Sequence, residues 1–192
     1  DRYFVYAGRY DARQDLATLL AALERLAAAG RPTELGDRVP WPPRFLLIGA
    51  SPADRAEVAR AAARVDVGEL LSYAPGLADA RVAALVRGAR AAVLPVVSDS
   101  TGLPAIEAIA SGTPVIASAI GPLPDIVGTA GIVVAPRDAD RLASALSTTW
   151  ADDRVHDGLA AAAHERAAGE GRTWADVARE TRAVYAEVAR RA

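Results

Sequence analysis

Six short apolar runs recur along the chain, and a helical pattern follows each of them. The runs cover residues 3–7, 45–48, 70–73, 91–94, 114–117 and 131–134. Because they are continuously apolar rather than alternating, they are typical of strands buried on both faces of a parallel sheet. Right-handed crossovers between parallel strands leave few possible topologies. The sequence therefore predicts an α/β fold, a Rossmann-like doubly wound parallel sheet of about six strands in the order 3-2-1-4-5-6.

The helical segments show apolar residues at three- and four-residue spacing. They are expected over residues 15–29, 52–64, 79–87, 106–110, 122–127, 139–149, 153–168 and 173–190. In the last of them this spacing predicts a stripe that packs in the core. The stripe consists of Trp174, Val177, Thr181, Val184, Tyr185 and Val188. Residues 30–43 are broken by prolines and read as a long loop, in which we expect Trp41 to pack on the sheet edge.

Composition excludes several functional classes. The chain has 192 residues, 52% of them hydrophobic, which suits one globular domain, and its net charge of -2 gives no reason to expect a nucleic acid partner. The absence of cysteine excludes disulfides and thiolate chemistry and suits a reducing, cytoplasmic location. The chain has no methionine and runs directly into its first strand, so we expect a domain excised from a longer protein, whose association with a membrane stays open.

Residues 99–107, Asp-Ser-Thr-Gly-Leu-Pro-Ala-Ile-Glu, form the turn between the fourth strand and its helix. Ser100 and Thr101 can cap the helix, Gly102 lets a ligand approach the backbone, and Pro104 suits the first helical turn. A helix start with exposed amides binds phosphate well. We therefore expect free amides at Thr101, Gly102 and Leu103 to hold an anion.

Two carboxylates, Asp99 and Glu107, bracket these amides. Carboxylates repel phosphate but accept hydrogen bonds well from sugar hydroxyls. A ligand that combines a diphosphate with sugar rings satisfies both features. The turn therefore indicates a nucleotide sugar.

The stretch from Asp99 to Glu107 resembles the acid-x7-Glu motif of the family 4 (group 1) glycosyltransferases, which have the GT-B fold. The resemblance continues through residues 108–118, 121–128 and 131–134 and includes Val-Tyr-Ala-Gly-Arg at residues 5–9, so it covers nearly the whole chain. It matches only the C-terminal, donor-binding half of such an enzyme. The N-terminal acceptor domain is then absent from this chain, and the terminal helix, residues 173–192, is one that often crosses back toward that domain.

The resemblance also implies residue roles. Arg9, Asp99 and Glu107 would be catalytic: Arg9 and the helix amides would stabilise the leaving nucleoside diphosphate, Glu107 would bind the ribose, and Asp99 would bind the transferred hexose with retention at its anomeric carbon. No metal or other cofactor is expected. The donor-binding set would be Gly8, Arg9, Arg13, Gln14, Tyr73, Asp99, Ser100, Thr101, Gly102, Leu103 and Glu107.

Three departures from the family pattern favour an alternative, a degenerate sugar-nucleotide-binding module without transfer activity. Asp99 is one methylene shorter than the usual glutamate, Gln14 stands where lysine is usual, and Thr101 replaces a common aromatic residue. Since every basic residue here is arginine, loss of lysine alone does not explain Gln14. Either Arg13 has taken over the diphosphate contact, or the site tolerates one charge fewer, or it no longer stabilises a leaving group. A GT-B sugar-nucleotide epimerase is a further alternative.

The remaining motifs have structural explanations. Asp138-Ala139-Asp140 matches a metal-binding D-x-D pattern, but it lies at a helix start, where acidic residues complement the helix dipole. His156 and His164 are expected on a solvated surface. No G-x-G-x-x-G, Walker or G-x-S-x-G pattern occurs, which argues against dinucleotide oxidoreductases, NTPases and serine hydrolases.

Overall fold

The computed structural model describes residues 2–33, 35–169 and 173–191. Its centre is a six-stranded sheet, all parallel, in the order β3-β2-β1-β4-β5-β6. The strands are β1 (Phe4–Ala7), β2 (Phe45–Ile48), β3 (Leu71–Ala74), β4 (Ala92–Leu94), β5 (Val115–Ser118) and β6 (Gly131–Val134). Each lies within about one residue of the predicted run. The predicted fold and strand order are confirmed.

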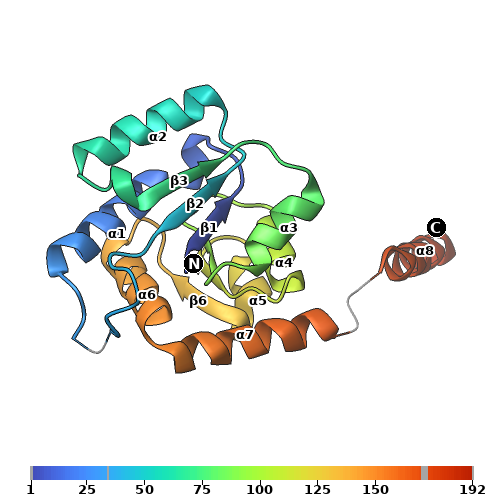
Figure 1. Cartoon of the computed structure of the whole chain (residues 1–192). Coiled ribbons are helices and arrows are strands. Elements are labelled where there is room, and N and C mark those ends of the chain that lie inside the picture. The colour runs from blue at the N-terminus through green and yellow to red at the C-terminus, as the bar shows by residue number, and fades with distance from the viewer. Residues whose placement is uncertain (1, 34, 170–172, 192) are drawn as a thin grey trace.

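Helices cover both faces of the sheet (Figure 1). They are α1 (Leu16–Ala29), α2 (Pro52–Arg64), α3 (Asp79–Arg87), α4 (Leu103–Ala110), α5 (Leu123–Val127), α6 (Ala139–Ala151), α7 (Asp153–Ala168) and α8 (Trp174–Arg191). Short 3-10 turns occur at Ala12–Gln14, Gly68–Leu70 and Gly128–Ala130. Within the described ranges, none of the helices is both long and apolar enough to cross a membrane.

Two apolar clusters form the core, one on each face of the sheet. Alternate strand residues such as Tyr6 and Leu47 pack under α1, α2 and α6. Their neighbours, such as Val5 and Ile48, pack under α3, α4, α5 and α7. The continuous apolar runs arise because each strand supplies side chains to both clusters. Strand β4 ends at Leu94, because Pro95 has no N–H to continue the ladder.

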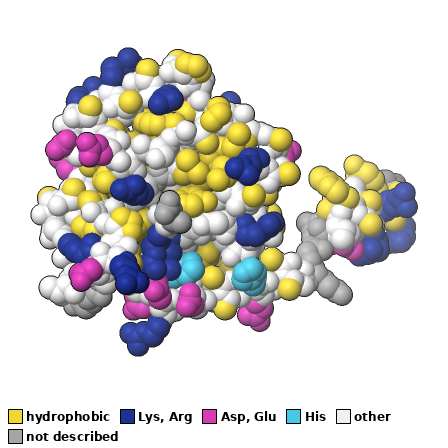
Figure 2. Space-filling view, in the orientation of Figure 1, with side chains coloured by type: hydrophobic (Ala, Val, Ile, Leu, Met, Phe, Trp, Pro, Cys, Tyr) yellow, Lys and Arg dark blue, Asp and Glu magenta, His cyan; other side chains and the backbone are white. Residues whose placement is uncertain are grey.

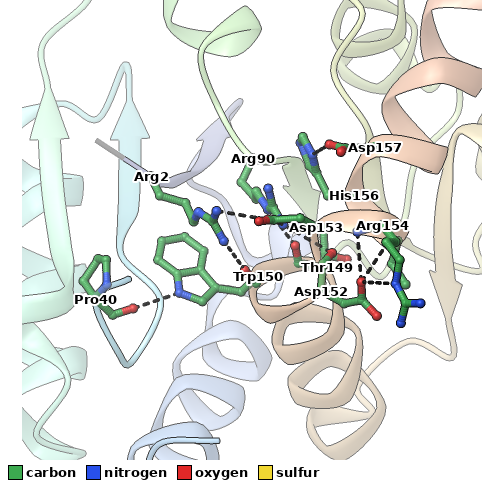
Figure 3. Close-up of polar contacts among 11 residues, drawn as sticks. Arg2, Pro40, Arg90, Thr149, Trp150, Asp152, Asp153, Arg154, His156 and Asp157 are labelled. Atoms are coloured by element: carbon green, nitrogen blue, oxygen red, sulfur yellow. Dashed lines mark hydrogen bonds and ion pairs between the residues drawn. The ribbon is translucent and has the colours of Figure 1, made fainter. Parts of the chain in front are cut away.

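The segment between α1 and β2 closes one side of this core. Trp41 is partly buried and packs against the cluster under α1, α2 and α6. Nearby, the indole Nε1 of the fully buried Trp150 donates to the carbonyl oxygen of Pro40 at 2.8 Å. The loop is therefore attached to the end of α6 by a hydrogen bond between distant parts of the sequence (Figure 3).

Arg90, just before β4, ties the junction of α6 and α7 to the sheet. Its guanidinium is buried and donates to the carbonyl oxygen of Thr149 at 2.7 Å and to the Asp153 carboxylate at 2.6 Å. Arg2 contacts the same carboxylate and the backbone oxygen of Trp150 (Figure 3). Burial is the main reason that the pKa of Arg90 falls below its usual value.

The D-x-D pattern forms a helix cap, as predicted. The Asp138 side chain accepts from the Arg141 amide at the start of α6, and Asp140 forms an ion pair with Arg25 of α1. The described residues contain no group of three or more His, Cys, Asp or Glu side chains arranged to hold a metal ion.

The two histidines lie on α7 in different surroundings. His164 is exposed, as predicted, and its ring lies over Gly112. His156 is half-buried and contacts Asp157 at 2.9 Å, so the prediction of a fully solvated residue is wrong. It lines a hollow together with Arg2, Arg90 and Pro114, which lie just before β1, β4 and β5.

Helix α8 departs from the prediction of core packing. Trp174 is 87% exposed and Tyr185 71% exposed, and no residue of the helix is buried. Figure 1 shows the helix apart from those that cover the sheet, and Figure 2 shows its hydrophobic side chains gathered on one side. The spacing predicted the apolar stripe correctly, but a stripe alone does not determine what covers it.

A chain ending after residue 172 is expected to keep its free energy of unfolding within about 0.5 kcal/mol, because α8 buries no side chain against the rest of the structure. Urea denaturation followed by circular dichroism measures this difference. A loss above about 1 kcal/mol would show that α8 packs on the domain in solution.

Candidate functional site

The strand order changes direction between β1 and β4, which lie side by side although β2 and β3 separate them in sequence. Loops that follow such neighbouring strands diverge and leave a crevice at the carboxyl edge of the sheet. Here the two loops also contact each other, since the Val97 amide donates to the carbonyl oxygen of Arg13 at 2.8 Å. The predicted site residues on these loops therefore lie at one edge of the sheet.

A pocket of about 350 Å³ opens beside this crevice, between α3 and α4. Its floor comes from β1 and β4, and one wall is lined by Glu107 of α4 and by Ser111, the residue after that helix. The opposite wall is mainly apolar and includes Val82 and Val86 of α3. An apolar pocket with a few polar groups is the usual form of a small-molecule site.

The loop after β1 carries the cationic candidates. Arg13 donates to Asp11 through Nη2 at 2.6 Å and Nε at 3.1 Å, while Arg9 Nε lies 3.4 Å from the same carboxylate. Hydrogen bonding from Arg13 lowers the pKa of Asp11 to about 2. The Arg9 side chain is 79% exposed, so it is the more accessible of the two cations.

The side chain of Gln14 is held by a residue of the preceding strand, β1. The Tyr6 hydroxyl donates to Gln14 Oε1 at 3.0 Å and also contacts the backbone oxygen of Arg9. Gly8, between them, leaves the space that the Tyr6 ring needs, since a Cβ there would lie 3.1 Å from the hydroxyl. Burial raises the pKa of Tyr6, with smaller contributions from Tyr10 and Asp11. Gln14 therefore helps to fix the shape of this loop.

The start of α4 differs from the prediction of free amides. The Asp99 carboxylate accepts from the amides of Thr101 at 2.8 Å and Gly102 at 2.7 Å. The cap residue is Gly102 in the left-handed region (φ 64°), with no side-chain cap. The hydroxyl of Thr101 makes only a long 3.4 Å contact with the Leu103 amide, and Ser100 is exposed. The prediction that Ser100 caps the helix is wrong, and Thr101 reaches only the Leu103 amide. The amides of Ala105 and Ile106, which a side-chain cap would bind, donate to the carbonyl oxygen of Gly102 instead.

Glu107 is exposed on α4 and faces the pocket, one turn after the helix start. Asp99 is half-buried in the preceding loop. The structure thus brings Arg9, Asp99 and Glu107 to the same edge of the sheet. A ligand spanning this edge would meet a cation, a helix start and a carboxylate.

Tyr73 lies elsewhere. It is on β3, on the face covered by α1 and α2, where the Arg55 guanidinium lies 5.0 Å from its ring centroid. Its hydroxyl is buried, and no described residue forms a hydrogen bond with it. The structure does not bring Tyr73 to the pocket beside Glu107.

Sequence reasoning missed the other wall of the pocket. Asp79, Val82, Ala83 and Val86 of α3 line it, and Ser111 follows Glu107 by one helical turn. Helix α3 follows the third strand, so its start had to lie near the carboxyl edge. The spacing of Glu107 and Ser111 could have indicated one face of α4.

Comparisons with known proteins agree with this geometry. Residues 1–152 match the family model described as glycosyl transferases group 1. The D-inositol 3-phosphate glycosyltransferase of Streptomyces griseus is 34% identical over 188 residues, which cover 94% of this chain and 38% of that relative. The chain therefore spans well under half the length of this relative.

Solved structures share the fold. Sucrose-phosphate synthase from Thermosynechococcus elongatus superposes with a TM-score of 0.76 at 27% identity, over 100% of this chain and 46% of that one. Anabaena HepE, solved in complex with UDP, gives a TM-score of 0.69 at 19% identity, over 86% of this chain and 43% of that one. The family model covers most of the chain, and the Streptomyces relative covers nearly all of it. The chain is therefore a C-terminal GT-B domain that belongs to the group 1 glycosyl transferases.

Proposed function

We propose that this chain is the donor-binding half of a retaining glycosyltransferase that moves a hexose from a nucleoside-diphosphate sugar to an acceptor. The observation that carries the proposal is the pocket beside Glu107, which adjoins the start of α4 at the switch point of the sheet in a chain of this family. The solved HepE structure contains UDP, which supports a nucleotide as the ligand.

The nucleoside would occupy the pocket. Glu107 would accept hydrogen bonds from the ribose hydroxyls, since an exposed carboxylate can take both at once. The base would lie toward the apolar wall formed by Val82 and Val86. This placement directs the diphosphate out of the pocket toward the start of α4.

The diphosphate would lie between Arg9 and the amides of Thr101 and Gly102, just before α4. Transfer breaks the bond between the anomeric carbon and the phosphate oxygen, and negative charge develops on the leaving diphosphate. A guanidinium and a positive helix end stabilise that charge. Asp99 would then contact the hydroxyls of the transferred hexose, and no step in this scheme requires a metal ion.

The acceptor site would belong to residues outside this chain, in an N-terminal domain. This domain alone would provide the contacts to the donor, but it would neither bind the acceptor nor close over the donor to exclude water. The 192-residue chain alone is therefore expected to bind a nucleotide without catalysing transfer.

A thermal-shift panel tests the proposal, using UDP, GDP, ADP and their glucose derivatives. A ligand at about 100 times its Kd stabilises a protein by about 2.7 kcal/mol, so a rise in Tm of about 5 °C or more is expected for at least one base. Adenosine and free phosphate serve as controls. The absence of a shift with all six nucleotides would contradict the proposal.

A degenerate binding module without transfer activity is the second candidate. The observation that favours it is that Arg13 pairs with Asp11 and Gln14 accepts from Tyr6 of β1, which leaves Arg9, the more exposed cation, for a diphosphate. Both candidates bind a nucleotide sugar. Release of nucleoside diphosphate by the full-length protein supports transfer, and binding without release supports the module.

A further inference from the structure

We propose that the Asp99 carboxylate occupies the phosphate-binding amides of its own chain and thereby makes the site favour a nucleotide sugar over the bare nucleoside diphosphate. This inference rests on the proposed function, because it assumes that the diphosphate binds at the start of α4. It adds a role for Asp99 that precedes any contact with the hexose.

The contacts are short and well placed. One oxygen, Oδ1 of Asp99, accepts from both the Thr101 amide at 2.8 Å and the Gly102 amide at 2.7 Å. An incoming phosphate oxygen would need the same two donors. The Asp99 carboxylate therefore occupies the position proposed for a phosphate group of the ligand.

The backbone around these amides is packed on both sides. Gly102 is buried, and a Cβ there would lie 2.3 Å from Cδ1 of Ile126 on α5. At the other end, a Cβ on Gly121 would lie 2.5 Å from the carbonyl oxygen of Asp99. The amides are therefore held in position. The part free to move is the Asp99 side chain, which can leave by rotation about its own torsions.

Displacing the Asp99 carboxylate from the two amides costs free energy, and the net cost differs between the two ligands. A bare nucleoside diphosphate takes the amides and leaves a carboxylate without partners beside a second anion, which is unfavourable. A nucleotide sugar brings hydroxyls that can donate to the displaced carboxylate. Both ligands must displace the carboxylate, but only the hydroxyls of the nucleotide sugar give it new hydrogen-bond donors. The site is then biased toward its substrate and against its product.

The length of the Asp99 side chain determines whether its carboxylate can reach the two amides. Aspartate closes a short ring with the amides two and three residues ahead, as Asp and Asn commonly do in turns. Glutamate is one methylene longer and closes that ring poorly. Asp99→Glu therefore keeps the charge but releases the amides, whereas Asp99→Asn keeps the length and removes the charge.

Isothermal titration of the 192-residue chain tests the inference, with the nucleoside diphosphate that binds best among UDP, GDP and ADP and with its glucose derivative. Asp99→Glu is expected to bind the diphosphate at least about threefold more tightly than the unaltered chain. The affinity ratio of nucleotide sugar to diphosphate should fall in Asp99→Ala, which removes both the competitor and the hydroxyl acceptor. Thermal unfolding without ligand checks that each variant is folded.

Two results would overturn the inference. If Asp99 only repels phosphate, Asp99→Asn and Asp99→Ala tighten diphosphate binding while Asp99→Glu does not. If Asp99 only shapes the turn, Asp99→Glu and Asp99→Ala bind the diphosphate equally or more weakly. If Asp99→Glu does not fold, Asp99→Ala and Asp99→Asn decide together: the inference requires Asp99→Ala to bind the diphosphate more tightly than Asp99→Asn, whose Oδ1 can still occupy the amides, whereas equal affinities would overturn it. The proposed function is tested separately, because it requires Glu107→Ala to weaken nucleotide binding in the chain that retains Asp99, whatever the Asp99 variants do.

Discussion

Replacing Trp150 with alanine is expected to lower the free energy of unfolding by about 3 to 5 kcal/mol, the usual cost of removing a large aromatic side chain from a core. The indole is fully buried and lies 5.1 Å from the ring of Phe4, measured between centroids. Its Nε1 also donates to the carbonyl oxygen of Pro40, which would lose its partner. The change therefore creates a cavity and leaves an acceptor unpaired at the same place.

Urea denaturation followed by circular dichroism measures this effect. Trp150→Phe keeps most of the apolar contact and loses the hydrogen bond, so a smaller loss of about 1 kcal/mol or somewhat more is expected. Trp174→Ala on the exposed α8 is the matched control and should change stability by less than about 0.5 kcal/mol. Equal losses for Trp150→Ala and Trp174→Ala would contradict the burial of Trp150.

Replacing Glu107 with alanine is expected to weaken binding of a nucleoside diphosphate by about 1 to 3 kcal/mol, the range for a lost hydrogen bond to a charged group. Glu107 is exposed and lines the pocket between α3 and α4. Because no described residue forms a hydrogen bond or ion pair with its carboxylate, the substitution should leave the fold intact. Isothermal titration with the best-binding nucleotide measures the change.

Glu24→Ala is the matched control for Glu107→Ala. Glu24 is exposed on α1, the helix that covers the opposite face of the sheet, so its removal should not alter nucleotide affinity. A 2′,3′-dideoxynucleotide should be insensitive to Glu107→Ala, because it lacks the ribose hydroxyls. Equal affinity of the Glu107→Ala and unaltered chains for the full nucleotide would make Glu107 a surface residue without a binding role.

The sheet could be predicted from sequence because its signal is local and redundant. Runs such as residues 45–48 and 114–117 are continuously apolar, a pattern typical of strands that are buried on both faces of a sheet. Once six such runs alternate with helices, crossover handedness restricts the order of the strands. The neighbouring positions of Arg9 and Asp99 follow from that order.

The hydrogen bonds of the site could not be predicted in the same way. Asp99 can accept from a ligand or from the two amides ahead of it, and the sequence is the same in both cases. Likewise, the sequence shows only that Gln14 lacks the charge of the usual lysine, whereas the structure shows its Oε1 accepting from the Tyr6 hydroxyl. Such contacts depend on side-chain torsions and on the packing around them.

Tyr73 and α8 show a different limit. The resemblance placed Tyr73 with the donor site, but its position on β3 turns it toward α2. The spacing of apolar residues predicts the stripe on α8, but within the described part of the chain no residue of α8 is buried. A local pattern indicates which side of an element is apolar, and the partner of that side depends on residues far away in the sequence or outside the chain.

A nucleoside diphosphate is expected to bind between the start of α4 and the pocket beside Glu107. Amide chemical shifts of the 192-residue chain, recorded by NMR during titration with the best-binding nucleotide, test it most directly. We expect the largest shifts on Thr101, Gly102 and Leu103, on Glu107 and on the start of α3, and we expect Glu107→Ala to lower the affinity that the titration measures. Largest shifts around Tyr73 and α2, with no change at Thr101 and Gly102, would contradict it.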